Sequence, residues 1–301
     1  MNAAVQLDIP SATYDLELVS GGIKKVKTEN RRADAMSWMD PRKIQVMPGF
    51  NARIRTPSYL QHLRDIVESM KGEDGYLIDK PISVFVAREG DADVVYAVGG
   101  HTRLEAALTA IEEGASFTEI PVVLLPKTTN MVDMTVDLYK GNTGRPLTPY
   151  ETAIVAKRLN RMELSESEIG RRLGLAQSHV NGLLLLAGAP RAIATMVIND
   201  ELSASEAINA LRKHGIRAVE ILQQAKAKAE AEGKTKVTAS HLPGAAFNKA
   251  VKRSAPLLFA AAKSITQDPG YAGLSAESRT KLDQLLSELA ALEVAPDAAA
   301  A

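Results

Sequence analysis

Two glycines break an apolar run near the end of the first third of the chain. The run lies in residues 94–107, VVYAVGGHTRLEAA, which read as a strand followed at once by a helix. If the strand turns at Gly99 and Gly100, the new helix presents backbone N–H groups and the positive end of its dipole to an anion. Arg103 can add charge-assisted hydrogen bonds. The pattern predicts a phosphate site or, as the alternative, only a tight connection whose helix is capped by Thr102.

A second stretch that can do chemistry is residues 166–185, ESEIGRRLGLAQSHVNGLLL. Apolar residues at helical spacing predict two short helices that pack on each other, with Gly174 in the turn. Polar side chains are left outward, and those expected to contact DNA are Arg171, Arg172, Gln177, Ser178, His179 and Asn181. Glutamine and asparagine can bond adenine edges in a major groove, and arginines can bond phosphates. The stretch predicts a helix-turn-helix, and the alternative is an ordinary helical hairpin with a solvated polar face.

Charge is distributed unevenly along the chain. The 36 lysines and arginines balance the 36 aspartates and glutamates, so the total gives no hint of a polyanionic partner. Residues 140–191, however, contain eight basic and four acidic residues. Positive charge is therefore concentrated where phosphates would lie, which favours DNA binding by the helix pair.

Composition excludes several kinds of chemistry. The 301-residue chain has no cysteine, which excludes disulfides, thiolate metal sites and cysteine nucleophiles. Its five histidines are not spaced as metal ligands. No apolar run approaches about 18 residues, and the N-terminus lacks the order of a signal peptide. We expect a cytoplasmic protein with no membrane segment.

The phosphate-binding turn needs a scaffold, and residues 41–140 predict a small α/β domain. Alternation and turn residues predict the strands, and apolar periodicity predicts the helices. The expected elements are an extended piece at 43–46, a helix after Thr56-Pro57-Ser58, a hairpin of 81–86 and 94–98, a helix over 102–113 and a strand at 120–125.

Helical signals dominate after residue 141. Ser/Thr–Glu capping pairs begin at Thr148, Ser165 and Ser203 and mark three helix starts, so 141–215 is expected to be an all-α helix-turn-helix domain. Residues 216–295 predict a helical C-terminal region whose last helix carries a leucine stripe, suited to packing within the domain or to dimerisation. The predicted fold class is α+β, mainly α. We expect a flexible basic arm at 1–40 and a disordered tail at 296–301.

The order of these motifs resembles that of the ParB family of plasmid and chromosome partition proteins, including KorB-like regulators, over about residues 42–215. The family's G-E-R-R turn corresponds to GHTR at 100–103, and its E-N-x-x-R motif to GNTGR at 141–145. The family's L-T-P-x-E-x-A follows at 147–153, as LTPYETA. Its earlier P-x-Q-P-R element is kept loosely as GFNAR at 49–53.

The resemblance implies a ParB/sulfiredoxin-like α/β domain and a homodimer that binds double-stranded DNA at a centromere-like or operator site. It also implies CTP and Mg²⁺ as ligands, closure into a sliding clamp, and a ParA-type ATPase as a possible partner of the basic arm. The positions that match a nucleotide site are Arg53, Gly99, Gly100, His101, Thr102, Arg103, Asn142 and Arg145. No catalytic residue and no metal ligand is assigned.

Three positions depart from the family's pattern. His101 and Thr102 replace the glutamate and first arginine of G-E-R-R, and Gly141 replaces the glutamate that helps to hold magnesium. The loss of these charges predicts weakened or lost hydrolysis. Sulfiredoxin chemistry is excluded because it needs a cysteine.

Two other functions remain open. One is a KorB-like transcriptional repressor without a partition role, which uses the same helix-turn-helix. The other is a ParB-fold enzyme, such as a nucleotide hydrolase, a nuclease or a small-molecule kinase. Enzymes of that kind usually place carboxylates for metal or base work. Glu105 is near the turn but is equally consistent with a surface residue.

Overall fold

The sheet is built around one hairpin. In the computed structural model, β5 (Ile82–Glu89) and β6 (Ala92–Gly99) pair in antiparallel fashion. Gly90, in the turn between them, has a φ of 57°, a left-handed conformation that suits glycine. Both strands are rich in valine, which fits a pleated and buried surface. The expected hairpin is confirmed.

The remaining strands extend this hairpin on both sides into one mixed sheet. They are β1 (Val19–Ser20), β2 (Arg32–Ala33), β3 (Met36–Met39), β4 (Ile44–Val46) and β7 (Ile120–Leu124). The strand order is β2-β3-β7-β5-β6-β4, with β1 also paired to β5. Pairs β5–β7 and β4–β6 are parallel, and the other pairs are antiparallel.

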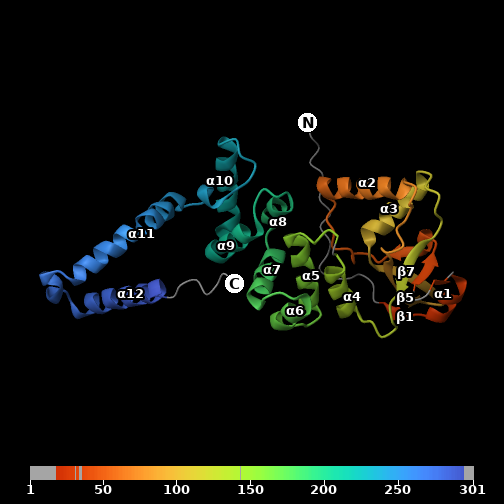
Figure 1. The fold of residues 1–301 in the computed structure, drawn as a ribbon, viewed down its shortest axis with the longest axis horizontal. Coiled ribbons are helices and arrows are strands. Elements are labelled where there is room, and N and C mark those ends of the chain that lie inside the picture. Colours follow the sequence, from red (N-terminus) through yellow and green to blue (C-terminus); the bar gives the residue numbers. More distant parts are fainter. Residues whose placement is uncertain (1–17, 31, 34–35, 143, 295–301) are drawn as a thin grey trace. The chain divides into compact units, whose positions relative to one another are not determined.

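The structure describes residues 18–30, 32–33, 36–142 and 144–294, and the fold is α+β, mainly α. The chain divides into two compact units, Met1–Thr238 and Ala239–Ala301. Figure 1 shows the sheet and its helices at the red-to-yellow end of the chain and the helices that follow in green and cyan.

The segment just before residue 40 is structured, which differs from the expected flexible arm. A short helix, α1 (Ile23–Glu29), buries Val26, and β3 joins the sheet with Met39 only 1% exposed. The Asp93 carboxylate accepts a hydrogen bond from the Gly22 N–H and so fixes the start of α1. Lys24, Lys25 and Lys27 lie on the exposed face of α1. Residues 1–17 lie outside the described residues.

Two helices and the sheet form the hydrophobic core of the α/β part. α2 (Pro57–Lys71) is capped by Thr56, and α3 (His101–Glu112) follows β6 directly. The two helices pack against each other (Figure 1). Val67 and Met70 of α2 and Leu104 of α3 share one buried cluster with sheet residues. A 3-10 turn, η1 (Pro41–Lys43), precedes β4.

A helical layer completes the first unit. Its elements are α4 (Met131–Lys140), α5 (Pro149–Arg161), α6 (Glu166–Leu173), α7 (Gln177–Ala187), α8 (Arg191–Ile198), α9 (Ala204–His214), η2 (Gly215–Arg217) and α10 (Ala218–Ala231). The three expected helix starts are confirmed, since Thr148, Ser165 and Ser203 each accept an N-terminal backbone N–H. The reciprocal bond of a full capping box is present at Thr148.

Helix α10 packs with α8 and α9 and belongs to the first unit, whereas the sequence placed everything after residue 215 in a separate region. Its buried residues include Leu222 and Ala225. A bridge between Leu202 and Val237 joins the segment after α10 to the helical layer. An alanine-rich helix can pack closely on its neighbours, and its composition alone does not reveal this.

The second unit consists of two long helices with a short connection. Its elements are η3 (Ala239–His241), α11 (Ala245–Thr266), η4 (Pro269–Gly273) and α12 (Ala276–Val294), and α12 is the last helix that the sequence predicts. The apolar residues Phe247 and Leu257 are 70% and 73% exposed. Residues 296–301, the expected disordered tail, lie outside the described residues.

No single helix in the described part of the chain is long and apolar enough to cross a membrane. Helices α7 and α8 together are long and apolar enough, by length and composition only, but the pair is bent by 115°.

Candidate functional sites

The Gly-Gly turn has the geometry of a strand end that leads directly into a helix. β6 ends at Gly99, and Gly100 is the N-cap of α3 with a φ of 82°. This left-handed conformation favours glycine, and a β-carbon here would make a tight contact with Ile82 at 3.3 Å. The helix starts at His101, and no side chain caps it. The expectation that Thr102 caps the helix is wrong, because Gly100 occupies the capping position.

His101 lies under this turn as a buried, neutral residue. Its ring packs 5.8 Å from Phe50 and donates a hydrogen bond to the Ala97 carbonyl. Burial lowers the pKa of His101 to about 4, so the imidazole is uncharged at neutral pH. Its Nε2 atom has no hydrogen-bond partner within the described part of the chain. His101 therefore contributes packing and a neutral acceptor to this turn, and no positive charge.

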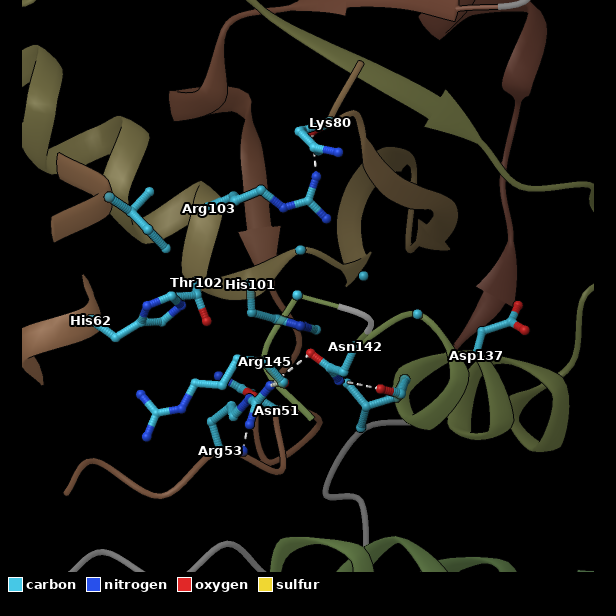
Figure 2. A pocket seen from close by; sticks show the side chains of 16 residues that line it. Asn51, Arg53, His62, Lys80, His101, Thr102, Arg103, Asp137, Asn142 and Arg145 are labelled. Carbon is cyan, nitrogen blue, oxygen red and sulfur yellow. Dashed lines mark hydrogen bonds between the residues drawn. The ribbon is translucent and has the colours of Figure 1, made fainter. Parts of the chain in front are cut away.

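A cavity of about 270 Å³ opens in front of the turn. Basic side chains reach its lining from different parts of the chain, as Figure 2 shows: Lys80, Arg103 and Arg145 lie around it. Arg103 donates to the carbonyls of Lys80 and Pro81. Arg145 donates to the Ser58 carbonyl at 3.0 Å. All of these acceptors are neutral, so both guanidinium charges remain available to an anion.

Arg53 is held in the wall of the same cavity by a network of buried acceptors. It donates to the Glu151 carboxylate at 3.2 Å, to the Pro146 carbonyl at 2.9 Å and to Oδ1 of Asn142 at 3.0 Å. It also donates to the Arg145 carbonyl. Burial lowers the pKa of Arg53, while Glu151 opposes that shift. Its contacts position the loop that carries Asn142 and Arg145.

The structure brings all the residues of the predicted nucleotide site to this one cavity. They are Arg53, Gly99, Gly100, His101, Thr102, Arg103, Asn142 and Arg145. Which of them bind a ligand stays a prediction. Sequence reasoning missed Asn51, His62, Lys80 and Asp137, which line the cavity as well. Asn51 lies within the GFNAR element at 49–53, but no local motif marks His62, Lys80 or Asp137, because the chain topology brings them to the cavity.

Glu105 is absent from the described lining of the cavity. Its carboxylate accepts hydrogen bonds from Arg55 at 2.6 Å and from the Tyr59 hydroxyl at 3.1 Å. These contacts tie α3 to the start of α2. These contacts favour the interpretation of Glu105 as a structural residue at the surface.

Helices α6 and α7 form the helix pair that the sequence predicts. Gly174 has a φ of 73° in the turn between them. A β-carbon at Gly170 would lie 2.6 Å from the Leu175 carbonyl oxygen, so this glycine permits the close approach. Ile169 and Val180 are fully buried on the facing sides of the two helices. α7 also packs against α5, which fixes it in the helical layer.

The polar side chains expected on α7 are exposed. Gln177, Ser178 and His179 occupy its first turn, and none of their side chains is hydrogen-bonded to another residue that the structure describes. Asn181, one turn later, donates to the Glu166 carboxylate at 3.2 Å and accepts from Arg212 at 3.0 Å. The first turn of α7 thus presents free donors and acceptors in the way a major-groove helix does.

Two further arginines lie on α6, and both are paired. Arg171 bonds Glu168 at 2.6 Å, and Arg172 bonds Glu168 and Asp133, both at 2.9 Å. The two guanidinium groups lower the pKa of Glu168 to about 2. A DNA phosphate would have to compete with these carboxylates. Arg212 at the end of α9 is the basic residue beside α7 that sequence reasoning missed.

The arrangement is an α/β layer with a basic cavity, followed by a helix pair with an exposed polar turn. A similar solved structure is the C-terminally truncated chromosome-partitioning protein ParB from Caulobacter crescentus complexed to the centromeric parS site, with 18% identity and a TM-score of 0.43, over 65% of this chain and 92% of that chain. Another is the same truncated protein complexed with CTP-gamma-S, with 20% identity and a TM-score of 0.29, over 63% of this chain and 97% of that chain. No protein-family model matches the sequence, and no curated protein matches it.

Proposed function

We propose that the protein is a ParB-type DNA-binding protein that recognises a centromere-like or operator site through α7. The observation that carries the proposal is the exposed first turn of α7, with Gln177, Ser178 and His179 on a helix whose other face is buried against α5 and α6. Side chains of these types can bond base edges and phosphates. The ordered motifs at 100–103, 141–145 and 147–153, which resemble those of the ParB family, support the same function.

Arg212 strengthens this proposed interface. It donates to Asn181 on α7, and it belongs to a last turn of α9 that also contains Lys213 and His214. Cations at this place supply the sequence-independent attraction to phosphates that DNA binding requires. We assign Arg212 to the interface as a phosphate-contacting residue that also orients Asn181.

The cavity is proposed to bind a nucleoside triphosphate, with CTP as the nucleotide that the family resemblance implies. Lys80, Arg103 and Arg145 surround it, and the N-terminus of α3 faces it. This combination of cations and a helix N-terminus suits a phosphate chain. The Arg53–Glu151 contact links the cavity wall to α5, which supports an influence of the nucleotide on DNA binding. No catalytic residue is proposed.

The decisive experiment is a DNA-binding measurement on the full chain. Labelled fragments that tile the host replicon are titrated with the protein at fixed salt, with and without CTP, and fluorescence anisotropy reports the affinity. We expect one fragment to bind at least about a thousandfold more tightly than the others. Equal affinity for all fragments would refute site-specific recognition. An affinity that is the same with and without CTP would refute nucleotide gating only.

Partition also needs partners. The proposed form is a homodimer, which would read a palindromic site, and a ParA-type ATPase is the proposed partner of the N-terminal segment. Lys24, Lys25 and Lys27 are exposed on α1 and supply the basic surface for such a contact. The test measures the activity of an ATPase encoded by a neighbouring gene. The full chain should stimulate it, and a variant with all three lysines replaced by alanine should not. DNA binding without any effect on replicon retention would favour the repressor.

A further inference from the structure

The cavity is poor in the ligands that magnesium needs. Mg²⁺ bound with a nucleotide is held by one or two protein carboxylates together with phosphate oxygens and waters. Of the 16 described residues that line the cavity, only Asp137 carries a carboxylate. Among the described residues, no group of three or more histidines, aspartates or glutamates is placed to hold a metal ion.

The position of Asp137 does not suit a carboxylate ligand for Mg²⁺ in this cavity. Its carboxylate points away from Arg53 and Arg145 in Figure 2. Desolvation and the neighbouring Asp133 raise the pKa of Asp137, so its surroundings disfavour the charged form that a cation would need.

The two positions that correspond to the family's E-N pair do not form a metal site either. Asn142 uses both ends of its amide, since Oδ1 accepts from Arg53 and Nδ2 donates to the Leu138 carbonyl. A metal ion at Oδ1 would also meet the charge of Arg53. Gly141 has no side chain, and a β-carbon there would lie 2.9 Å from the Asp137 carbonyl oxygen. A glutamate at 141 would require the end of α4 to shift.

The cavity is lined by the cationic side chains of Lys80, Arg103 and Arg145, which can neutralise phosphate charge without a metal ion. Arg103 and Arg145 bond only neutral acceptors among the described residues. Lys80 is an exposed ammonium at the same cavity and forms a solvent-exposed ion pair with its neighbour Asp79 at 3.2 Å. The donor set does not fit Mg²⁺ and does fit a phosphate chain. We infer that the cavity binds the triphosphate of its nucleotide without a divalent cation, with Lys80, Arg103 and Arg145 neutralising the phosphates. This inference rests on the proposed nucleotide-binding function.

The test compares CTP binding to the full chain in excess EDTA and in excess MgCl₂ by isothermal titration calorimetry. We expect the affinity in EDTA to equal or exceed that in magnesium, with a difference below about threefold if both forms of CTP fit. Binding that is about tenfold or more tighter in magnesium would overturn the inference and leave nucleotide binding intact. No binding of CTP in either buffer would remove the proposed nucleotide function, and the inference with it.

Single variants identify which cationic side chains bind the phosphates. Lys80→Ala and Arg145→Ala should each weaken CTP binding in EDTA by about tenfold, because each removes a charge-assisted contact. Lys127→Ala is the matched control, since Lys127 is exposed and is not part of the described lining. Asp137→Asn should leave the affinity unchanged in both buffers. A loss of binding in Asp137→Asn that appears only in magnesium would identify Asp137 as a metal ligand and overturn the inference.

Discussion

The guanidinium of Arg53 and the carboxylate of Glu151 lie 3.2 Å apart, with side chains only 6% and 4% exposed. Arg53 comes from the loop before α2, and Glu151 comes from the first turn of α5. Glu151 also accepts the backbone N–H groups of Ile54 and Thr148, each at 2.8 Å. One buried carboxylate therefore joins the wall of the cavity to the helical layer that carries α7.

Removal of Arg53 should destabilise the fold strongly. Arg53→Met leaves the Glu151 carboxylate buried without its guanidinium, and we expect a loss of about 3 to 5 kcal/mol in the free energy of unfolding. Urea denaturation followed by circular dichroism measures it. The control is Arg55→Met, which breaks the more exposed pair with Glu105 and should cost less than about 1 kcal/mol. Equal losses in the two variants would contradict a special role for the Arg53–Glu151 pair.

Loss of one polar side chain from the first turn of α7 should weaken DNA binding and leave the fold intact. Gln177→Ala removes an exposed side chain without a partner among the described residues, so the unfolding midpoint should not move. Affinity for the selected fragment should fall by about 1 to 3 kcal/mol if Gln177 reads a base. Anisotropy titration provides the measurement. Gln223→Ala, at an exposed glutamine of α10, is the control, and a Gln177→Ala affinity equal to it would refute the recognition role.

The sequence predicted the two parts of the molecule that depend on local patterns. Glycine positions and apolar spacing marked the turn before α3 and the α6–α7 pair, because their geometry follows from residues close together in the chain. The short strand β3 and its place in the sheet were missed, since MSWM has no clear alternation and its partner β7 lies 80 or more residues later.

The cavity lining was predictable only in part for the same physical reason. Arg103 and Arg145 belong to motifs, whereas Lys80 and Arg212 take their positions from the chain topology. Residue type also gave no sign of protonation state. His101 stands where the family resemblance suggested a charged group, but only the structure shows that burial keeps it neutral.

The neutral state of His101 predicts how stability depends on pH. Its pKa is about 4 in the folded state, against 6.5 for an unperturbed histidine, so only the unfolded chain takes up the proton between these values. The contribution is fully present above about pH 6.5 and is lost as the pH falls toward 4. We expect His101 to account for up to about 3 kcal/mol of acid destabilisation over that window. Urea denaturation at a series of pH values measures it.

A variant separates His101 from the other titrating groups. His101→Phe keeps an aromatic ring beside Phe50 but cannot be protonated, so its stability should fall less steeply than that of the wild type between pH 6.5 and 4. His179→Gln changes an exposed histidine and should keep the wild-type slope. An unchanged slope in His101→Phe would show that other groups cause the acid dependence.

The second unit exposes large apolar side chains on both of its long helices. Phe247, Leu257 and Leu258 are 70%, 73% and 58% exposed on α11, and Leu285 is 50% exposed on α12. Side chains of this size favour burial, so we expect the full chain to be a dimer of 32.3 kDa subunits through this unit. A chain that ends at Ser275 loses α12 and should be monomeric by light scattering, whereas a control that ends at Val294 should stay dimeric. A dimer that survives the loss of α12 at the same concentration would place the interface elsewhere in the chain.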